Sequence, residues 1–191
     1  MNRFFISLVL LITLMLAGCA KTPSPAAPKP AEADSVAELS FNFTRQGWIA
    51  TNQFAVWVED NQGRHIKTLY ATNYTANGGW RRRESSLSQW VRQSGLANMS
   101  KNQIDTLTGV TPQTGIQTYR WDGTDSHNIA VQPGDYVIYL EGSLRWANRV
   151  LYRAPIQIGQ GAAAAQITTE YIGKPGKEQA MISSVIVRTL R

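Results

Sequence analysis

The sequence is poor in the residues from which most catalytic and redox centres are built. It has one cysteine, Cys19, and two histidines, His65 and His127. A single cysteine excludes an internal disulfide, a CxxC redox pair and a cysteine-ligated metal. With two histidines and no HExxH pattern, a zinc or non-haem iron site would need carboxylates as its remaining ligands. The GxSxG, GxxxxGK[ST] and GxGxxG patterns are also missing, so hydrolase-triad and nucleotide-fold enzymes are not supported.

The sequence also lacks an apolar run long enough to cross a bilayer as a helix. Residues 4–16 are almost wholly apolar and follow the basic start MNR, but they are fewer than the ~20 residues that a span needs. This arrangement predicts a cleaved signal peptide at residues 1–18. The run ends in LAGC at residues 16–19, which resembles the lipobox of bacterial lipoproteins. The resemblance implies that the Cys19 thiol carries a diacylglycerol with palmitate-type chains.

The residue after this cysteine predicts where the lipid anchor is inserted. It is Ala20, and not the aspartate that, by resemblance to the Gram-negative sorting rule, retains a lipoprotein in the inner membrane. We therefore expect a lipid anchor in the outer membrane with the domain in the periplasm. Residues 19–38 are rich in proline and have no periodic apolar face, which predicts a tether. The folded domain is predicted at residues 39–191, near the usual size of one domain.

Positive charge exceeds negative charge, with 19 Lys+Arg against 13 Asp+Glu and a net charge of +6. Nucleic acid is not an expected partner in the periplasm, and a solvated basic surface is the ordinary interpretation of such an excess. Anionic lipid, a cell-wall polymer or a phosphorylated small molecule are the alternatives. The densest basic cluster is Arg81, Arg82 and Arg83, next to Trp80. These four residues form a candidate surface for a planar anionic ligand.

Strand patterns dominate the predicted domain. Residues 39–43 alternate apolar and polar side chains, and residues 53–59 and 65–71 do so on either side of a turn. Further strands are predicted at residues 115–121, 135–141, 149–158, 165–172 and 181–190. Pro155 inside one of them indicates a sheet edge or a bulge. With one or two short helices, near residues 86–95 and 101–108, seven to nine strands predict an all-β antiparallel sandwich.

Two longer stretches resemble known families. The run WDGTDSHNIAVQPGDYVIYLEG at residues 121–142 resembles a hairpin of the Ig-like module of flagellar hook-capping proteins, which implies an Ig-like sandwich. Together with QFAVWVEDNQGRHIKTL at 53–69 and LSQW at 87–90, it resembles a family of predicted periplasmic proteins of unknown function. That family context implies a role beside extracytosolic flavin and iron-reduction systems.

Residues 105–111 resemble the flavinylation motif of periplasmic FMN-binding domains, Asp-x-x-Ser/Thr-Gly-Ala-Thr. The match is carried by Asp105, Thr108, Gly109 and Thr111, and it implies that a flavin transferase attaches FMN to Thr111 through a phosphoester. Val110 departs from the alanine of the motif, and its branched side chain would crowd the acceptor. The alternative interpretation of the same residues is a capped helical turn that ends at Gly-Val-Thr-Pro.

One acidic stretch invites a cation. Asp122, Asp125, His127 and Asp135 lie close together in the sequence, as the oxygen ligands of calcium sites do. Their spacing does not follow the EF-hand pattern, and Asp-Gly and Pro-Gly are expected in turns between strands. A solvated turn without a metal is therefore predicted.

These observations predict a lipid-anchored β-sandwich of the periplasm that is not an enzyme. We expect an accessory of a flavin and iron redox system, whose partners would be a flavoprotein, a flavin transferase or a membrane reductase. The alternative is a structural or binding module that docks another envelope protein or a cell-wall polymer. An enzyme acting through Glu59, Asp60 and Asp122 would need these carboxylates to share a pocket.

Overall fold

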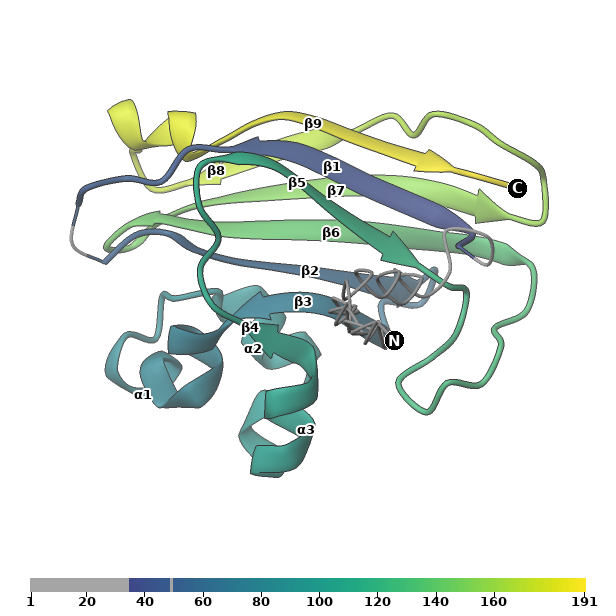
Figure 1. Ribbon diagram of the computed structural model, residues 1–191, viewed down its shortest axis with the longest axis horizontal. Coiled ribbons are helices and arrows are strands. Elements are labelled where there is room, and N and C mark those ends of the chain that lie inside the picture. The colour runs from purple at the N-terminus through teal and green to yellow at the C-terminus, as the bar shows by residue number, and fades with distance from the viewer. Residues whose placement is uncertain (1–34, 49) are drawn as a thin grey trace, which may run out of the picture. The chain divides into compact units, whose positions relative to one another are not determined.

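The strands of the protein form two sheets in a computed structural model that describes residues 35–48 and 50–191 (Figure 1). They are β1 (Ala37–Phe43), β2 (Gln53–Asp60), β3 (His65–Thr72), β4 (Thr108–Gly109), β5 (Gly115–Trp121), β6 (Gly134–Arg145), β7 (Asn148–Ile158), β8 (Thr168–Ile172) and β9 (Ile182–Thr189). One sheet has the order β5-β1-β9 and the other the order β4-β3-β2-β6-β7-β8. Neighbours are antiparallel except for the parallel pair β3 and β4. The predicted all-β sandwich is therefore confirmed.

The described part of the chain starts within the predicted tether. The predicted signal peptide at residues 1–18, Cys19 and the tether as far as residue 34 lie outside the described residues. β1 begins at Ala37, two residues before residue 39, at which the folded domain was predicted to begin. The described residues all belong to one compact unit. Their helices are all too short or too polar to cross a membrane.

The main core lies between the two sheets and is rich in aromatic side chains. The alternation of β1 places Phe41 and Phe43 inward, and both are 1% exposed. They pack against Phe54 of β2, with ring centroids 5.2 and 5.3 Å apart. Burial of such large apolar groups supplies most of the free energy that holds the sheets together, at about 25 cal/mol per Å² removed from water.

A helical layer covers the other face of the six-stranded sheet. It contains η1 (Thr75–Gly79), α1 (Trp80–Arg82), α2 (Ser88–Gln93), η2 (Leu96–Asn98) and α3 (Lys101–Leu107). Trp90 of α2 packs there in a second core cluster with Trp57 of β2, and both are fully buried. Successive residues of a strand point to opposite faces, so β2, with apolar residues on both sides, is buried along its whole length.

The predicted hairpin at residues 121–142 is wrong. β5 pairs with β1, whereas β6 pairs with β2 and β7, so residues 122–133 cross from one sheet to the other. The indole of Trp121 donates to the carbonyl oxygen of Thr124 at 2.8 Å, which closes the first turn of this crossing. A strand that ends in Trp-Asp-Gly predicts a turn, but the turn residues do not specify which sheet the next strand joins.

Candidate functional site

The segment with Thr111 is fixed at its start by α3 and β4. Ser100 and Gln103 form the predicted capping box: the Ser100 side chain accepts from the Gln103 N–H at 3.4 Å, and Gln103 Oε1 accepts from the Ser100 N–H at 2.8 Å. β4 then pairs in parallel with the end of β3 through Thr108 and Gly109. Residues 110–114 belong to no helix or strand. The capped helical turn is thus present whether or not Thr111 is modified.

Tyr70 of β3 holds the two residues that precede Thr111. Its hydroxyl donates to the carbonyl oxygen of Val110 at 2.5 Å. Its ring lies so close to Gly109 that an added Cβ would be 2.7 Å from a ring carbon. The glycine of the motif is therefore required by packing alone. Burial raises the pKa of the Tyr70 phenol above its ordinary value of 10.0, so the hydroxyl that donates to Val110 is protonated at neutral pH.

Thr111 itself is half-buried, and among the described residues its hydroxyl has no hydrogen-bond partner. Val110 beside it is 77% exposed. Asp105 lies on α3, where its carboxylate is 3.3 Å from the Lys101 ammonium. Asp105 therefore lies in α3, and Thr108 and Gly109 lie in β4. The hydroxyls of Thr108 and Thr111 both lack a partner among the described residues, but only Thr111 lies outside a helix or strand.

The four residues of the predicted anionic-ligand surface separate into two groups. Trp80 is half-buried against the second core cluster, and the guanidinium of Arg81 lies 5.0 Å from the centroid of its ring. Arg82 is exposed. Arg83 instead donates from Nε to the carbonyl oxygen of Trp146 at 2.9 Å. Arg81 and Arg82 thus remain at the surface, whereas Arg83 fixes the turn between β6 and β7.

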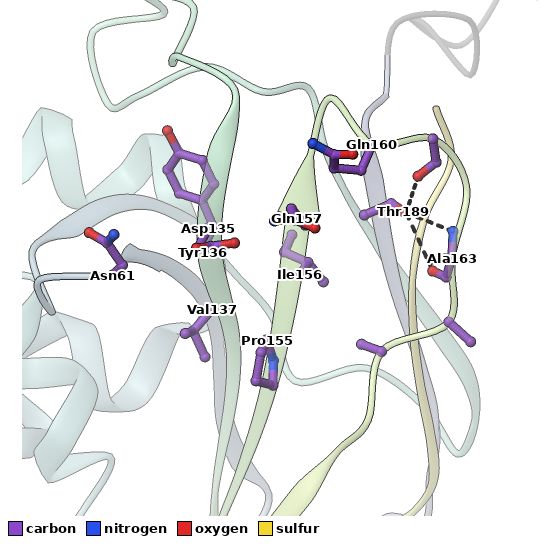
Figure 2. A pocket seen from close by; sticks show the side chains of 13 residues that line it. Asn61, Asp135, Tyr136, Val137, Pro155, Ile156, Gln157, Gln160, Ala163 and Thr189 are labelled. Carbon is purple, nitrogen blue, oxygen red and sulfur yellow. Dashed lines mark hydrogen bonds between the residues drawn. The ribbon is translucent and has the colours of Figure 1, made fainter.

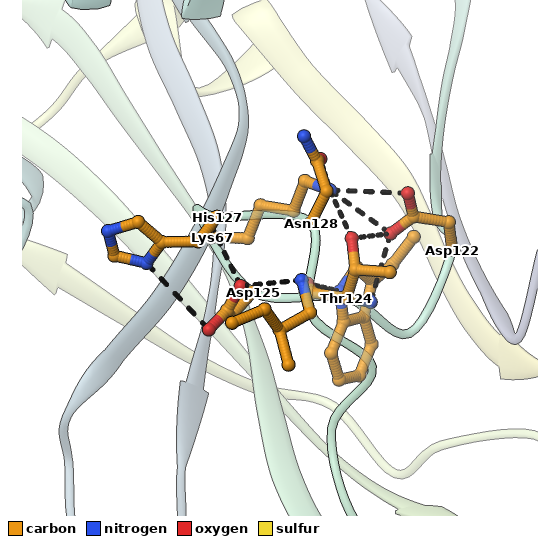
Figure 3. A network of polar contacts seen from close by, with 8 residues as sticks. Lys67, Asp122, Thr124, Asp125, His127 and Asn128 are labelled. Carbon is orange, nitrogen blue, oxygen red and sulfur yellow. Dashed lines mark hydrogen bonds and ion pairs between the residues drawn. The ribbon is translucent and has the colours of Figure 1, made fainter.

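A lysine lies at the centre of the acidic stretch (Figure 3). Lys67 Nζ donates to Thr124 Oγ1 at 2.5 Å, to Asn128 Oδ1 at 3.3 Å and to both carboxylate oxygens of Asp122 at 3.2 Å. Burial raises the pKa of Asp122, but hydrogen bonds from Thr124 and Lys67 outweigh it and hold that pKa below its usual range. The carboxylate of Asp122, one of the candidate cation ligands, therefore binds an ammonium.

The other members of the acidic stretch form no hydrogen bond or ion pair with this lysine among the described residues. Asp125 accepts hydrogen bonds from the backbone N–H groups of His127 and Ile129, at 2.8 and 2.9 Å, and so caps its own turn. Asp135 is on β6, at the rim of a different pocket. No group of three or more His, Cys, Asp or Glu side chains that could hold a metal was found in the described part of the chain.

The three carboxylates considered for an enzyme line neither of two pockets that lie in the described part of the chain. Glu59 accepts from the indole of Trp57 at 2.7 Å, beneath the helical layer. Asp60 pairs with Arg64 at 2.6 Å and closes the turn between β2 and β3. Asp122 belongs to the lysine network. Their side chains are each engaged in local structure.

Sequence reasoning missed an apolar pocket of about 370 Å³ at the edge of β7 (Figure 2). β7 is an interior strand of its sheet, but β8 pairs with it only from Arg149 to Arg153. Pro155 therefore has no strand partner on that side, so of the predicted edge or bulge it has a local edge position. Thr189 closes one side, because its hydroxyl donates to the Gly161 carbonyl at 2.7 Å and accepts from the Ala163 N–H at 2.8 Å. Pro155 was the one residue whose type indicated this opening.

Sequence reasoning also missed a fully buried carboxylate, Glu141 on β6. It accepts from Arg149 Nη1 at 2.7 Å and from the Trp90 backbone N–H at 2.9 Å. Burial raises the pKa of Glu141, and these hydrogen bonds oppose that rise. Because Trp90 is in α2, this contact joins the helical layer to the sheet.

A family model described as "Predicted periplasmic protein (DUF2271)" matches residues 37–174. The match begins with β1 and continues past the end of β8, so it includes the whole helical layer. No curated protein and no solved structure matches the chain.

Proposed function

The chain belongs to the DUF2271 family of predicted periplasmic proteins, and from this premise we propose that it is a non-enzymatic accessory of an extracytosolic flavin and iron-reduction system. In this proposal Thr111 carries FMN, and the lipid on Cys19 anchors an Ig-like sandwich to the outer membrane. The partners would be a flavin transferase, which loads Thr111, and a flavoprotein or membrane reductase.

The unengaged hydroxyl of Thr111 is the observation that carries this proposal. It follows a backbone that β3 and Tyr70 hold in place, and it precedes residues 112–114, which have no strand or helix. A transferase must reach the acceptor oxygen without first breaking a hydrogen bond or a strand, and Thr111 satisfies both conditions. Small side chains next to Thr111 would make it easier for the transferase to approach. Val110, with its branched side chain, departs from the alanine of the motif and is unfavourable in this respect.

In the proposed modification, the transferase moves an FMN group from a flavin dinucleotide to Thr111. Oγ1 of Thr111 forms an ester bond to the flavin-side phosphorus of a flavin dinucleotide and loses its proton. The phosphoanhydride bond of the donor breaks, and the nucleoside monophosphate leaves with the displaced oxygen. No oxidant or reductant is consumed, so the transferase and its donor suffice.

We predict that the domain, coexpressed with a flavin transferase, gains the mass of one FMN group and a yellow colour. Thr111→Ala should lose both, because the acceptor oxygen is absent. Thr111→Ser should retain both. Thr114→Ala is the matched control, since Thr114 is an exposed threonine of the same connection, and it should be modified like the wild type. Intact-protein mass spectrometry with peptide mapping reads out each result.

Val110→Ala sharpens the same experiment. It restores the small residue of the motif at a position that is 77% exposed, so it should raise the rate of modification without a loss of stability. The proposal would be contradicted if an active transferase modified neither the wild type nor Val110→Ala.

The edge strand β8 favours a second candidate function, docking of another envelope protein or a cell-wall polymer. It is the last strand of its sheet, and four of its five residues are exposed, including Tyr171 at 42%. An open edge can add a strand from a partner. A partner that binds wild type and Thr111→Ala but not Tyr171→Lys would support this function over the carrier.

A further inference from the structure

A polar depression lies beside α1, where η1 leads into this helix. Its volume is about 510 Å³, and Arg81 and Arg82 line it together with Asn73, Tyr74 and Asn77. Figure 1 shows α1 at the end of the domain opposite to the C-terminus. The depression is therefore separate from the edge pocket, which is lined by Thr189 near that terminus.

The two arginines of the depression carry charge that no carboxylate compensates. Both are exposed, and neither forms an ion pair with any residue that the structure describes. By contrast, Arg64, Arg149 and Arg153 each pair with a carboxylate at 2.6 to 2.8 Å. Two adjacent guanidiniums in a hollow concentrate positive potential there and can bind the oxygens of a phosphate or carboxylate through several charge-assisted hydrogen bonds.

A fixed aromatic ring stands beside these arginines. Tyr74 is 49% exposed, and Gly79 packs so closely on it that an added Cβ would be 2.7 Å from two atoms of the ring. One side of the ring therefore rests on backbone, while a large part of it faces solvent. An exposed, immobilised ring is a stacking surface for a flat ligand. The ring of Trp80 is not available in the same way, because Arg81 lies over it.

The amides of the depression complete its polar lining. Asn77 Nδ2 donates to the Asn73 carbonyl oxygen at 3.1 Å, which ties the two ends of the turn together. The side-chain amide of Asn73 has no hydrogen-bond partner among the described residues. It is thus an additional donor and acceptor for a bound molecule.

We propose that this depression binds a small anion in which a phosphate or carboxylate group is joined to a planar ring. Arg81 and Arg82 hold the anionic group, Tyr74 stacks on the ring, and Asn73 supplies a directional hydrogen bond. The site does not rest on the modification of Thr111, because its residues come from η1, α1 and the residues just before them.

Binding is tested with three probes on the unmodified domain, purified from cells without a flavin transferase. The probes are FMN as a planar phosphomonoester, riboflavin as the same ring without phosphate, and inorganic phosphate. Flavin fluorescence follows the first two, and calorimetry follows all three. FMN should bind more tightly than either riboflavin or phosphate, since it alone engages both the arginines and the ring.

Two double variants separate this site from the general positive charge. Arg81→Ala/Arg82→Ala should weaken FMN binding by about tenfold or more, the scale of one lost charge-assisted contact. Arg45→Ala/Arg92→Ala removes the same amount of charge from exposed arginines elsewhere. This double variant should change the affinity for FMN by less than about twofold. Tyr74→Ala should weaken FMN but leave phosphate binding unchanged.

Equal weakening by the two double variants would overturn the proposal in favour of diffuse electrostatic attraction. Failure of FMN to bind the folded wild type at millimolar concentration would overturn it as well. Neither result tests the attachment of flavin to Thr111, because that attachment needs the transferase and is measured as an increase in protein mass. Thr111→Ala should bind free FMN as the wild type does.

Discussion

At the scale of single residues, the carboxylate of Glu141 shows how one buried charge holds a layer in place. Arg149 supplies a guanidinium, and Gln89 and Trp90 supply backbone N–H groups at 3.4 and 2.9 Å. Each donor offsets part of the free energy lost when the charge leaves water. Removal of the carboxylate would leave the partly buried Arg149, whose side chain is 18% exposed, without its ion-pair partner. The buried Nε of Arg149 already lacks a hydrogen-bond partner within the described residues.

We predict that Glu141→Ala lowers the free energy of unfolding by about 3 kcal/mol, because it leaves the partly buried guanidinium of Arg149 without its partner and two N–H groups of α2 without their acceptor. Glu141→Gln should cost less, since its amide oxygen still accepts one hydrogen bond. Urea denaturation measures both. Glu170→Ala serves as the control, because Glu170 pairs with Arg153 at an exposed position, and its loss should cost at most about 1 kcal/mol. Similar costs for Glu141→Ala and Glu170→Ala would contradict the argument.

At the scale of elements, the turn between β6 and β7 combines a strained backbone with an exposed side chain. Trp146 has φ of 50°, a left-handed conformation that disfavours large residues. Its carbonyl oxygen accepts from Arg83 and from Ser85, and its N–H donates to the Ala50 carbonyl at 3.2 Å. The indole is 58% exposed. The backbone of Trp146, and not its side chain, therefore joins the turn between β6 and β7 to the loops that contain Ala50 and Arg83.

We predict that Trp146→Asn leaves the free energy of unfolding unchanged or raises it by up to about 1 kcal/mol, because asparagine tolerates the left-handed conformation. Trp146→Val should lower it by about 1–2 kcal/mol, because a branched Cβ does not. Urea denaturation of both variants gives the order. A large loss in the asparagine variant would show that the indole packs more than its exposure indicates.

Strand positions were predictable from the sequence, but strand partners were predictable only for neighbours joined by a short turn. β2 and β3 alternate on either side of a glycine turn, so their pairing follows from residues that are close in the sequence. The partner of β5 is β1, far away in the chain, and nothing in the local pattern specifies it. The second buried face of β2, where Trp57 packs under the helical layer, was not predicted, because it depends on contacts with α2.

At the scale of the whole molecule, His65 should make stability depend on pH. Burial lowers the pKa of His65 from 6.5 to about 4, and its Nε2 lies 2.9 Å from Thr68 Oγ1. Between these pH values the unfolded chain binds a proton that the folded protein excludes. The stabilising contribution of neutral His65 is therefore complete above pH 6.5 and is lost as the pH falls toward 4.

We predict that the wild type loses on the order of 2 kcal/mol more stability than His65→Gln when the pH falls from 7 to 4.5. The difference between the two proteins isolates His65, because every other titrating group is common to both. Urea midpoints across this range provide the measurement. His127→Gln is the matched control, since His127 is exposed, and parallel curves for wild type and His65→Gln would refute the prediction.

The capped turn before Thr111 was predictable from the sequence, but the surroundings of the candidate site residues were not. The sequence placed Thr111 after a capped turn, and the structure has that turn. The sequence did not show that the ring of Tyr70 packs against Gly109 and leaves no room for a side chain there. It also did not show that Arg83 binds the Trp146 carbonyl oxygen while Arg81 and Arg82 stay at the surface. Both features depend on contacts between segments that are distant in the sequence. Lys67 likewise enters the acidic stretch from β3, 55 residues before Asp122.

The position of β1 has a mechanical consequence. β1 is the first strand of the described chain, and it pairs along its length with β5 on one side and β9 on the other. If Cys19 carries the proposed lipid anchor, tension on the chain would reach the domain at β1, and a load parallel to the axis of this strand would act on it in shear. Hydrogen bonds on both sides would then bear the load together and not rupture one after another. Under such a load, the pairing of β1 on both sides would resist shear at the first strand after the proposed anchor.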